Sequence, residues 1–208
     1  MKIAGIYLAG GHSRRMRTTL PKLALPVGSK TLGSLALETI LSSSLKSIFV
    51  IVQEHDDVTW LPSSMKNHVK CTIIHCPNAH LGQAETLRCG IYQAIKEEMD
   101  AVIIFLADQP NLPVEMIHHM LQYTKQSPTS KFIALTFNEI IYPPVLFKKE
   151  LFDSLLKIEG DQGAKALLKE DFLKMGTLLP LHSEKSILDV DTKEQFQQFK
   201  KEMSRKSI

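Results

Sequence analysis

The chain has 208 residues, of which 44% are hydrophobic and 23% charged, and its formal net charge is +3. These values are typical of one globular domain with a sizeable core, so we expect a single domain over residues 1–208. The basic residues are scattered, which argues against nucleic acid as a partner. No stretch approaches the roughly 20 apolar residues of a membrane span, and the opening residues lack a secretory signal pattern. We therefore expect a cytoplasmic protein without membrane contact.

Strand-like and helical segments alternate over the first two thirds of the chain. The strand-like segments are short, apolar and rich in β-branched residues, namely Ile3–Leu8, Ile48–Val52, Thr72–His75, Ala101–Ala107 and Phe132–Thr136. The segments with a helical apolar stripe are Leu32–Leu41, Ala84–Lys96 and Val114–Tyr123. This order predicts an α/β fold with a doubly wound, mostly parallel sheet in three α/β/α layers.

The last third of the chain has a different pattern. Tyr142–Phe147 carries two prolines, which cannot donate to a ladder, so we expect an edge strand or an extended segment there. Helices are expected around Glu150–Ile158 and Ala164–Lys169. Leu188–Thr192 is expected to end a strand and cap a final helix, whose apolar stripe is Phe196, Phe199 and Met203.

A glycine turn follows the first strand. Gly10-Gly11 permits a sharp bend, and Arg14, Arg15 and Lys22 follow within one loop. Bare amides beside clustered cations are suited to binding a triphosphate. Neither a G-x-x-x-x-G-K-[ST] P-loop nor a G-x-G-x-x-G dinucleotide motif is present after this strand. A glycine turn with solvated arginines is the alternative interpretation.

A carboxylate follows the fourth strand-like segment. Asp108 begins the sequence D-Q-P at the carboxyl end of that strand, where ligands bind in open α/β sheets. If this strand neighbours the first, Asp108 faces the glycine turn and is suited to holding Mg²⁺ beside a triphosphate. A helix cap or Asx turn is the alternative role. Asp191 is the candidate second metal ligand, although Asp191 with Glu194, or Thr192 with Gln195, equally fits a capping box.

The three cysteines fit a reducing compartment. Cys71, Cys76 and Cys89 are odd in number and lack C-x-x-C spacing. We therefore expect reduced, buried thiols and no zinc site.

On these residues the chain resembles the MobA-like nucleotidyltransferases. Their pattern L-A-[GA]-G-x-S-x-R-M…K matches Leu8 to Met16 with Lys22, and their metal-binding D-[QM]-P matches the segment that begins at Asp108. Gly82 with Thr86 and Leu87 is similar to a G-x-x-x-S-L segment near the base. Three later blocks match in order, so that the six together cover nearly the whole chain: Pro144 to Phe147, Gly160 to Lys165 and Leu188 to Thr192.

The resemblance implies a Rossmann-like nucleotidyltransferase fold and a Mg²⁺-dependent reaction of a nucleoside triphosphate. The implied catalytic residues are Arg15, Lys22 and Asp108, and the implied metal ligands are Asp108 and Asp191. The implied nucleotide-binding residues are Leu8, Ala9, Gly10, Gly11, Ser13, Lys22, Gly82 and Thr86.

The D-Q-P and G-D-x-G-A-[RK] forms look most like the molybdenum cofactor cytidylyltransferases, which include accessory proteins of xanthine dehydrogenase maturation. That branch is implied to join CTP to the molybdopterin cofactor and to release pyrophosphate. A molybdoenzyme or its chaperone is implied as a further partner. Purine catabolism is the implied context.

Several departures from the family pattern leave the base open between CTP and GTP. Gly10-Gly11 is nearer the guanylyl-transferring relatives than the Ala-Gly of the cytidylyl branch, and Thr86 replaces the usual Ser. Arg17 replaces a usual Gly, the spacing to Lys22 is long, and Tyr142-Pro143 replaces Gly-x. A guanylyltransferase, a sugar-phosphate nucleotidyltransferase and a non-catalytic carrier of nucleotide or cofactor are the alternatives.

Overall fold

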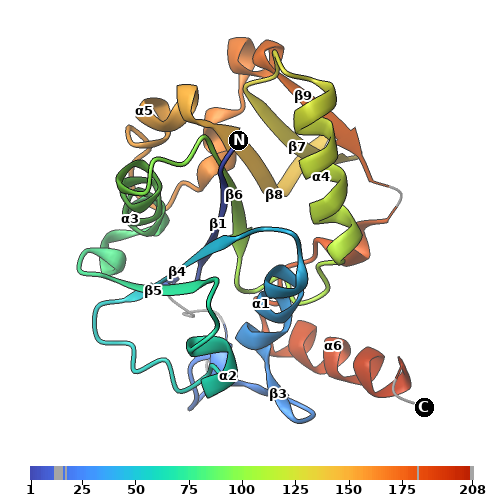
Figure 1. Ribbon diagram of the computed structural model, residues 1–208. Helices are drawn as coiled ribbons and strands as arrows, with labels where there is room; N and C mark the ends of the chain where they lie inside the picture. The colour runs from blue at the N-terminus through green and yellow to red at the C-terminus, as the bar shows by residue number, and fades with distance from the viewer. Residues whose placement is uncertain (12–15, 17, 182, 207–208) are drawn as a thin grey trace.

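The computed structural model describes residues 1–11, 16, 18–181 and 183–206. A seven-stranded sheet with the order β5-β4-β1-β6-β8-β7-β9 runs through the molecule (Figure 1). Within it β8 is antiparallel to both of its neighbours, and all other neighbouring pairs are parallel. The strands are β1 (Ile3–Leu8), β4 (Ser47–Gln53), β5 (Cys71–Cys76), β6 (Ala101–Leu106), β7 (Phe132–Phe137), β8 (Ile140–Lys148) and β9 (Gly176–Pro180), and a separate hairpin joins β2 (Pro26–Val27) to β3 (Lys30–Thr31).

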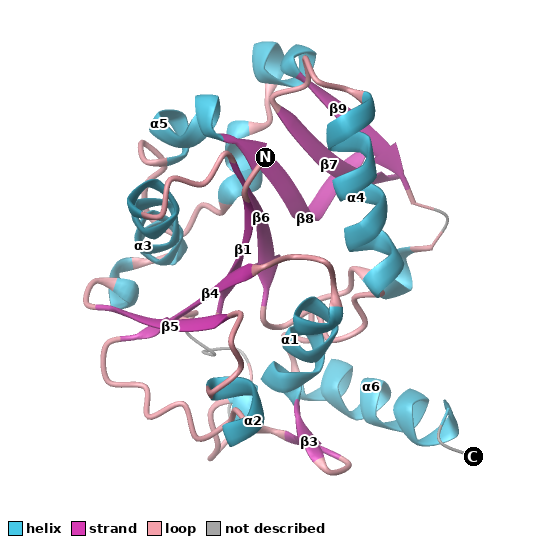
Figure 2. Ribbon diagram, in the orientation of Figure 1, coloured by secondary structure: helices cyan, strands magenta, loops and turns pink. Residues whose placement is uncertain are grey.

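Helices cover both faces of this sheet (Figure 2). Helices α1 (Leu32–Ser42) and α4 (Val114–Gln126) pack on one face, where Leu37 and Ile117 join one apolar cluster. Helices α3 (Gln83–Lys96) and α5 (Phe152–Leu155) pack on the other face, where Leu87 joins a second cluster. The predicted three-layer, doubly wound fold is therefore confirmed. Two further helices, α2 (Ser63–Lys66) and α6 (Lys193–Lys206), lie outside these layers.

Strand β1 is buried on both faces, as its continuous apolar sequence predicts. Tyr7 points into one cluster, and Ile6 and Leu8 point into the other. β1 pairs in parallel with β4 and with β6, in a register that places Leu8 beside Leu106. The expected neighbourhood of the first and fourth predicted strands is thus confirmed. The glycine turn after β1 and Asp108 after β6 consequently leave the sheet at the same edge.

Strand β8 is an interior strand, so the expectation of an edge strand at Tyr142–Phe147 is wrong. β8 lies between β6 and β7. Its ladder with β6 extends from Lys148 only to Val145, and its ladder with β7 has an irregularity where Pro143 and Pro144 stand. The prolines therefore occupy a bulge in which no amide donor is required.

The C-terminal third contains shorter elements than expected. A 3-10 turn at Lys149–Leu151 runs into α5, and another at Ala164–Leu167 replaces the expected helix there. No strand is present at residues 188–192, although this segment does precede the final helix as expected. Phe196 and Phe199 of α6 pack against Leu32 and Leu35 of α1. The remaining 3-10 turns are Lys22–Ala24, Ala79–Leu81, Glu170–Met175 and Glu184–Ser186.

Two of the three cysteines are joined, which corrects the expectation of reduced thiols. Cys76 at the end of β5 and Cys89 in α3 form a disulfide with a Cα–Cα distance of 6.1 Å, and Cys71 is free. The spacing of cysteines along the chain did not reveal this pair, because the packing of α3 on the sheet brings the two together.

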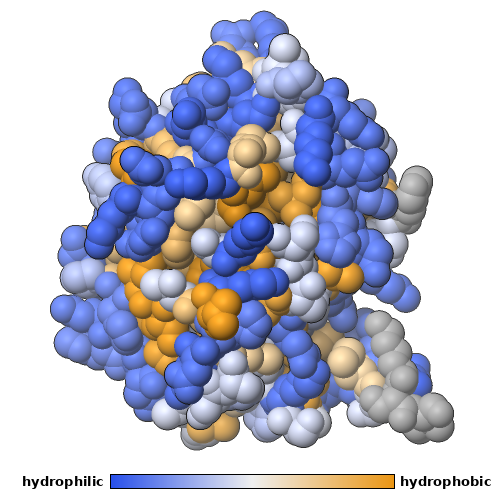
Figure 3. Space-filling model, in the orientation of Figure 1, coloured by the Kyte–Doolittle hydropathy of each residue, from blue (hydrophilic) through white to orange (hydrophobic). Residues whose placement is uncertain are grey.

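The outer surface is mainly hydrophilic in the view of Figure 3, with apolar side chains showing in the middle of the view and towards β5. Within the part of the chain that the structure describes, no helix is long and apolar enough to cross a bilayer.

Candidate functional site

A cavity of about 430 Å³ opens where β1 and β6 end. Eight of the predicted site residues line it, namely Leu8, Ala9, Gly11, Lys22, Gly82, Thr86, Asp108 and Asp191. The other lining residues were not among the predicted site residues, and they are Leu23, Ala79, Gln83, Leu106, Ala107 and Asp161. The predicted Ser13 and Arg15 lie outside the described residues.

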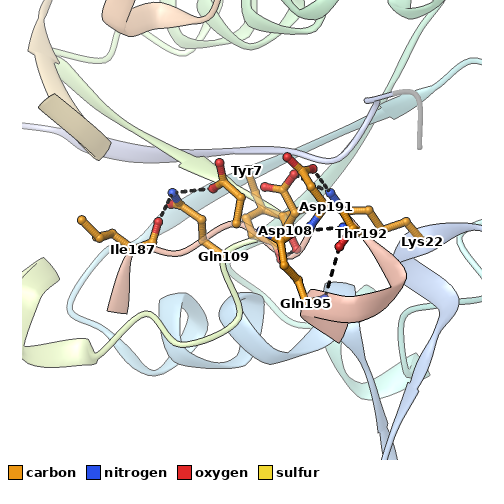
Figure 4. A network of polar contacts seen from close by, with 10 residues as sticks. Tyr7, Lys22, Asp108, Gln109, Ile187, Asp191, Thr192 and Gln195 are labelled. Atoms are coloured by element: carbon orange, nitrogen blue, oxygen red, sulfur yellow. Dashed lines mark hydrogen bonds and ion pairs between the residues drawn. The ribbon is translucent and has the colours of Figure 1, made fainter. Parts of the chain in front are cut away.

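The ammonium group of Lys22 lies between two carboxylates on one side of this cavity (Figure 4). Its Nζ donates to Asp108 Oδ2 at 2.7 Å and to Asp191 Oδ1 at 2.8 Å. Lys22 is only 7% exposed, and it starts the 3-10 turn at Lys22–Ala24. These are charge-assisted hydrogen bonds in a partly desolvated place, where they are stronger than on an open surface. Three residues from distant parts of the chain thereby form one ionic group.

Gln109 links the segment that carries Asp108 to the segment that carries Asp191 through hydrogen bonds. Its side chain is 3% exposed, and Nε2 donates to the Ile187 carbonyl at 3.0 Å and to Asp189 Oδ1 at 2.9 Å. The Val190 amide also donates to the Asp108 carbonyl at 2.9 Å. These contacts set Asp191 opposite Asp108. The D-Q-P motif was recognised from the sequence, but the role of its glutamine was not.

The final helix is capped by Thr192 and Gln195. Gln195 Oε1 accepts from the amides of Asp191 at 2.8 Å and Thr192 at 2.9 Å, and Thr192 Oγ1 accepts from the Gln195 amide at 3.2 Å. Of the two capping boxes considered, the structure therefore contains the one formed by Thr192 and Gln195. The carboxylate of Asp191 is directed to Lys22 instead.

Negative charge accumulates around Lys22. Burial, with the charges of Asp108 and Asp191, raises the pKa of Asp189 to about 6, although Gln109 opposes the shift by its hydrogen bond. Burial, with the charge of Asp108, also raises the pKa of Tyr7 far above its ordinary value, and its hydroxyl donates to the Gly33 carbonyl at 2.8 Å. Among the described residues, no group of three or more His, Cys, Asp or Glu side chains is arranged to hold a metal ion.

The two glycines of the turn do different things. Gly11 lines the cavity, and a β-carbon there would meet nothing within 4 Å. A β-carbon at Gly10 would lie 2.6 Å from Thr86 Cγ2, and the Gly10 carbonyl accepts from Gln53 Nε2 at 3.2 Å. Gly11 is thus placed to present its backbone to a ligand, whereas Gly10 allows the turn to pack closely on α3.

The segment Gly160 to Gly163, with the sequence G-D-Q-G, packs against the start of α3. Gly82 has φ +137°, and a β-carbon there would lie 2.5 Å from the Gly160 carbonyl oxygen and 3.0 Å from Asp161 Oδ1. The Ala84 amide donates to that same Gly160 carbonyl at 3.0 Å. Asp161 is therefore part of the cavity wall. The only sequence signal for this residue was its place in the block Gly160 to Lys165, which matches the family pattern.

The cavity lies at a reversal of strand order. From β1 the chain proceeds to β4 and β5 on one side and then crosses to β6 on the other side of β1. Doubly wound α/β proteins bind ligands in the crevice at such a switch point, outside the carboxyl ends of the strands. Fold and cavity together place the chain in this ligand-binding class of α/β proteins.

The chain belongs to the MobA-like NTP transferase family, whose domain matches residues 5–175. It is therefore a nucleotidyltransferase by family. It is 32% identical over 206 residues to the purine catabolism protein PucB of Bacillus subtilis (strain 168), covering 97% of this chain and 98% of PucB.

Solved structures share the fold at low sequence identity. Rv0371c from Mycobacterium tuberculosis H37Rv superposes with a TM-score of 0.78 at 17% identity, covering 96% of this chain and 97% of that one. Rv0371c has also been solved in complex with manganese. A cytidylyltransferase from Leptospira borgpetersenii superposes with a TM-score of 0.74 at 18% identity, covering 99% of this chain and 87% of that one.

Proposed function

We propose that this nucleotidyltransferase joins CTP to the molybdopterin cofactor, with Mg²⁺ and with release of pyrophosphate, in the maturation of a xanthine dehydrogenase-type molybdoenzyme. One domain over residues 1–208 carries the reaction, and the molybdoenzyme or its chaperone is the partner. The observation that carries the proposal is Lys22 held between Asp108 and Asp191 in the cavity beside the glycine turn. The relationship to a purine catabolism protein supports the molybdoenzyme, because xanthine is a purine.

The donor set of the acidic pair fits Mg²⁺. Two carboxylate oxygens from separate segments converge on one cationic group, Lys22 Nζ, at 2.7 and 2.8 Å. Mg²⁺ is a hard cation that proteins commonly hold by one or two carboxylates, with water and substrate phosphates as its other ligands. Asp108 and Asp191 would hold the ion, which when bound neutralises charge on the phosphates. The manganese complex of Rv0371c accords with a divalent cation in this fold.

The residues of the chain position the substrates and stabilise charge. An oxygen of the terminal phosphate of the cofactor attacks the α-phosphorus of CTP, a new P–O bond forms, and the bond to pyrophosphate breaks in line. The attacking phosphate is already ionised near pH 7, so no general base is required. Lys22 supplies a point charge for the phosphate oxygens, and Gly11 presents its backbone to them. Ser13 and Arg15 complete the proposed phosphate-binding loop.

The test is release of pyrophosphate. Wild-type protein is incubated with the molybdenum cofactor, Mg²⁺ and CTP, GTP, ATP or UTP in turn, and pyrophosphate is measured. The proposal expects kcat/KM for CTP to exceed that for GTP by at least about tenfold, which corresponds to roughly 1.4 kcal/mol. Binding of CTP without any turnover would favour the non-catalytic carrier instead.

A guanylyltransferase is the second candidate, because the Gly10-Gly11 turn resembles that branch. The close approach of Gly10 to Thr86 supplies a packing reason for this glycine that does not depend on the base. A preference for GTP in the same assay would reverse the choice of base and leave the proposed phosphate and metal roles in place.

A further inference from the structure

We infer that Asp161 reads the base of the bound nucleotide. Its carboxylate accepts a hydrogen bond from an exocyclic amino group and so selects CTP over UTP. This inference rests on the proposed function, because it requires a nucleotide in the cavity.

Asp161 lies on a different side of the cavity from the ionic group. It contacts the region of Gly82, where its Oδ1 is 3.0 Å from the position of a β-carbon, and Gln83 and Thr86 line the same wall. Gly82 follows β5 and Asp108 follows β6, and β4 and β1 lie between these strands. The wall formed by Gly82 and Thr86 packs against the glycine turn, since Thr86 Cγ2 lies 2.6 Å from the position of a β-carbon at Gly10. Phosphates held near Lys22 therefore leave the base to reach towards Asp161.

The segment that carries Asp161 is fastened to α3 on both sides of this residue. Before it, Arg88 Nε donates to the Leu156 carbonyl at 3.0 Å and Nη2 donates to the Ile158 carbonyl at 2.6 Å. Gly160 accepts from the Ala84 amide at 3.0 Å. After it, Gly163 lies so close to Gln83 that a β-carbon would be 2.8 Å from Oε1. The backbone on both sides of Asp161 is thus fixed, and a fixed backbone favours recognition by its exposed carboxylate.

The chemistry of a carboxylate restricts what it can contact. An ionised carboxylate only accepts hydrogen bonds, and it repels phosphate unless a cation lies between them, so a carboxylate apart from the ionic group is suited to the donors of the nucleoside, which are the ribose hydroxyls and the N–H groups of the base. Cytosine presents an amino group at N4, whereas uracil presents the carbonyl oxygen O4 at the same place. CTP and UTP differ only at ring positions 3 and 4, so their comparison tests recognition at this edge of the base. A matched donor against an opposed acceptor is worth about tenfold or more in affinity.

The test measures binding without turnover. CTP and UTP are titrated calorimetrically, with Mg²⁺ and no acceptor, into the full-length wild type, Asp161→Asn and the control Asp153→Asn. Asp153 is exposed on α5 and does not line the cavity. We expect the wild type and the control to bind CTP at least about tenfold more tightly than UTP. The Asp161→Asn variant should lose this preference and gain affinity for UTP, because the amide of its side chain can donate to O4. A merely structural role of Asp161 would not raise the affinity for UTP.

Each of the following outcomes would overturn the inference. A wild type that binds CTP but shows the same preference in Asp161→Asn overturns the inference and leaves the proposed function standing. A wild type that binds no nucleotide overturns both the inference and the proposed function.

Discussion

The Cγ2 methyl group of Thr86 fills the space that a β-carbon at Gly10 would need, because the two positions lie 2.6 Å apart. Thr86 is held in that position, since it is 2% exposed and its Oγ1 donates to the Gln83 carbonyl at 2.8 Å. Gly10 and Thr86 therefore form a closely packed pair, in which the threonine methyl group of the helix occupies the space beside the turn.

Gly10→Ala should destabilise the protein through this contact. A methyl group forced into a packed site costs about 1–3 kcal/mol of unfolding free energy. Adding Thr86→Ser removes the opposing methyl group, so the double variant should recover most of the loss. Urea unfolding of the wild type, both single variants and the double variant measures the coupling. Gly11→Ala is the control, because a β-carbon there meets nothing within 4 Å. Additive effects of the two substitutions would contradict the pairing.

Lys22→Ala should lower kcat/KM for the triphosphate by roughly 10²-fold, which corresponds to about 3 kcal/mol of transition-state stabilisation. The variant loses the point charge and leaves Asp108 and Asp191 without their shared cation. Pyrophosphate release measures the effect. Lys30→Ala is the control, since Lys30 is paired with Glu38 on an exposed surface. Turnover near the wild-type rate in Lys22→Ala would remove this lysine from the proposed mechanism.

Asp108→Asn should abolish turnover and leave the fold intact, because the amide keeps the shape of the carboxylate and loses the charge that Mg²⁺ requires. Turnover is measured across a Mg²⁺ titration, and circular dichroism checks the fold. Asp171→Asn serves as the control, since Asp171 is exposed and paired with Lys174. A Mg²⁺ dependence in Asp108→Asn equal to that of the wild type would exclude the metal role.

The disulfide should lower the number of thiols that react in a titration of the denatured protein. Thiol titration of denatured protein without reductant should find one free thiol, that of Cys71, and prior reduction should reveal three. Closing a loop with a sequence separation of 13 stabilises the fold by roughly 3 kcal/mol in the chain-entropy description. Cys89→Ser should therefore lower the Tm, and Cys71→Ser should change it little. Three reactive thiols before reduction would show that Cys76 and Cys89 are not bonded.

The local pattern of apolar residues was sufficient to predict most strands of the sheet. The apolar run Ile3–Leu8 was expected with the bounds that β1 has, and the helical stripe Val114–Tyr123 lies within α4. Burial on both faces of a parallel sheet requires continuous apolar residues, and burial on one face of a helix requires a stripe. Both requirements act on neighbours in the chain, so both can be read from the sequence. The glycine turn and Asp108 were found for the same reason, because each directly follows such a strand.

The tertiary structure alone decided which distant residues meet. Lys22 contacts Asp191 across a sequence separation of 169, and Gly160 packs on Gly82. The interior position of β8 and the pairing of Cys76 with Cys89 likewise depend on how separate elements pack. Residue periodicity carries no information about such contacts, since they are set by strand order and by which helix covers which face. The sequence by itself therefore determined the elements and the family of the chain, and packing assembled from them the ionic group and the wall that carries Asp161.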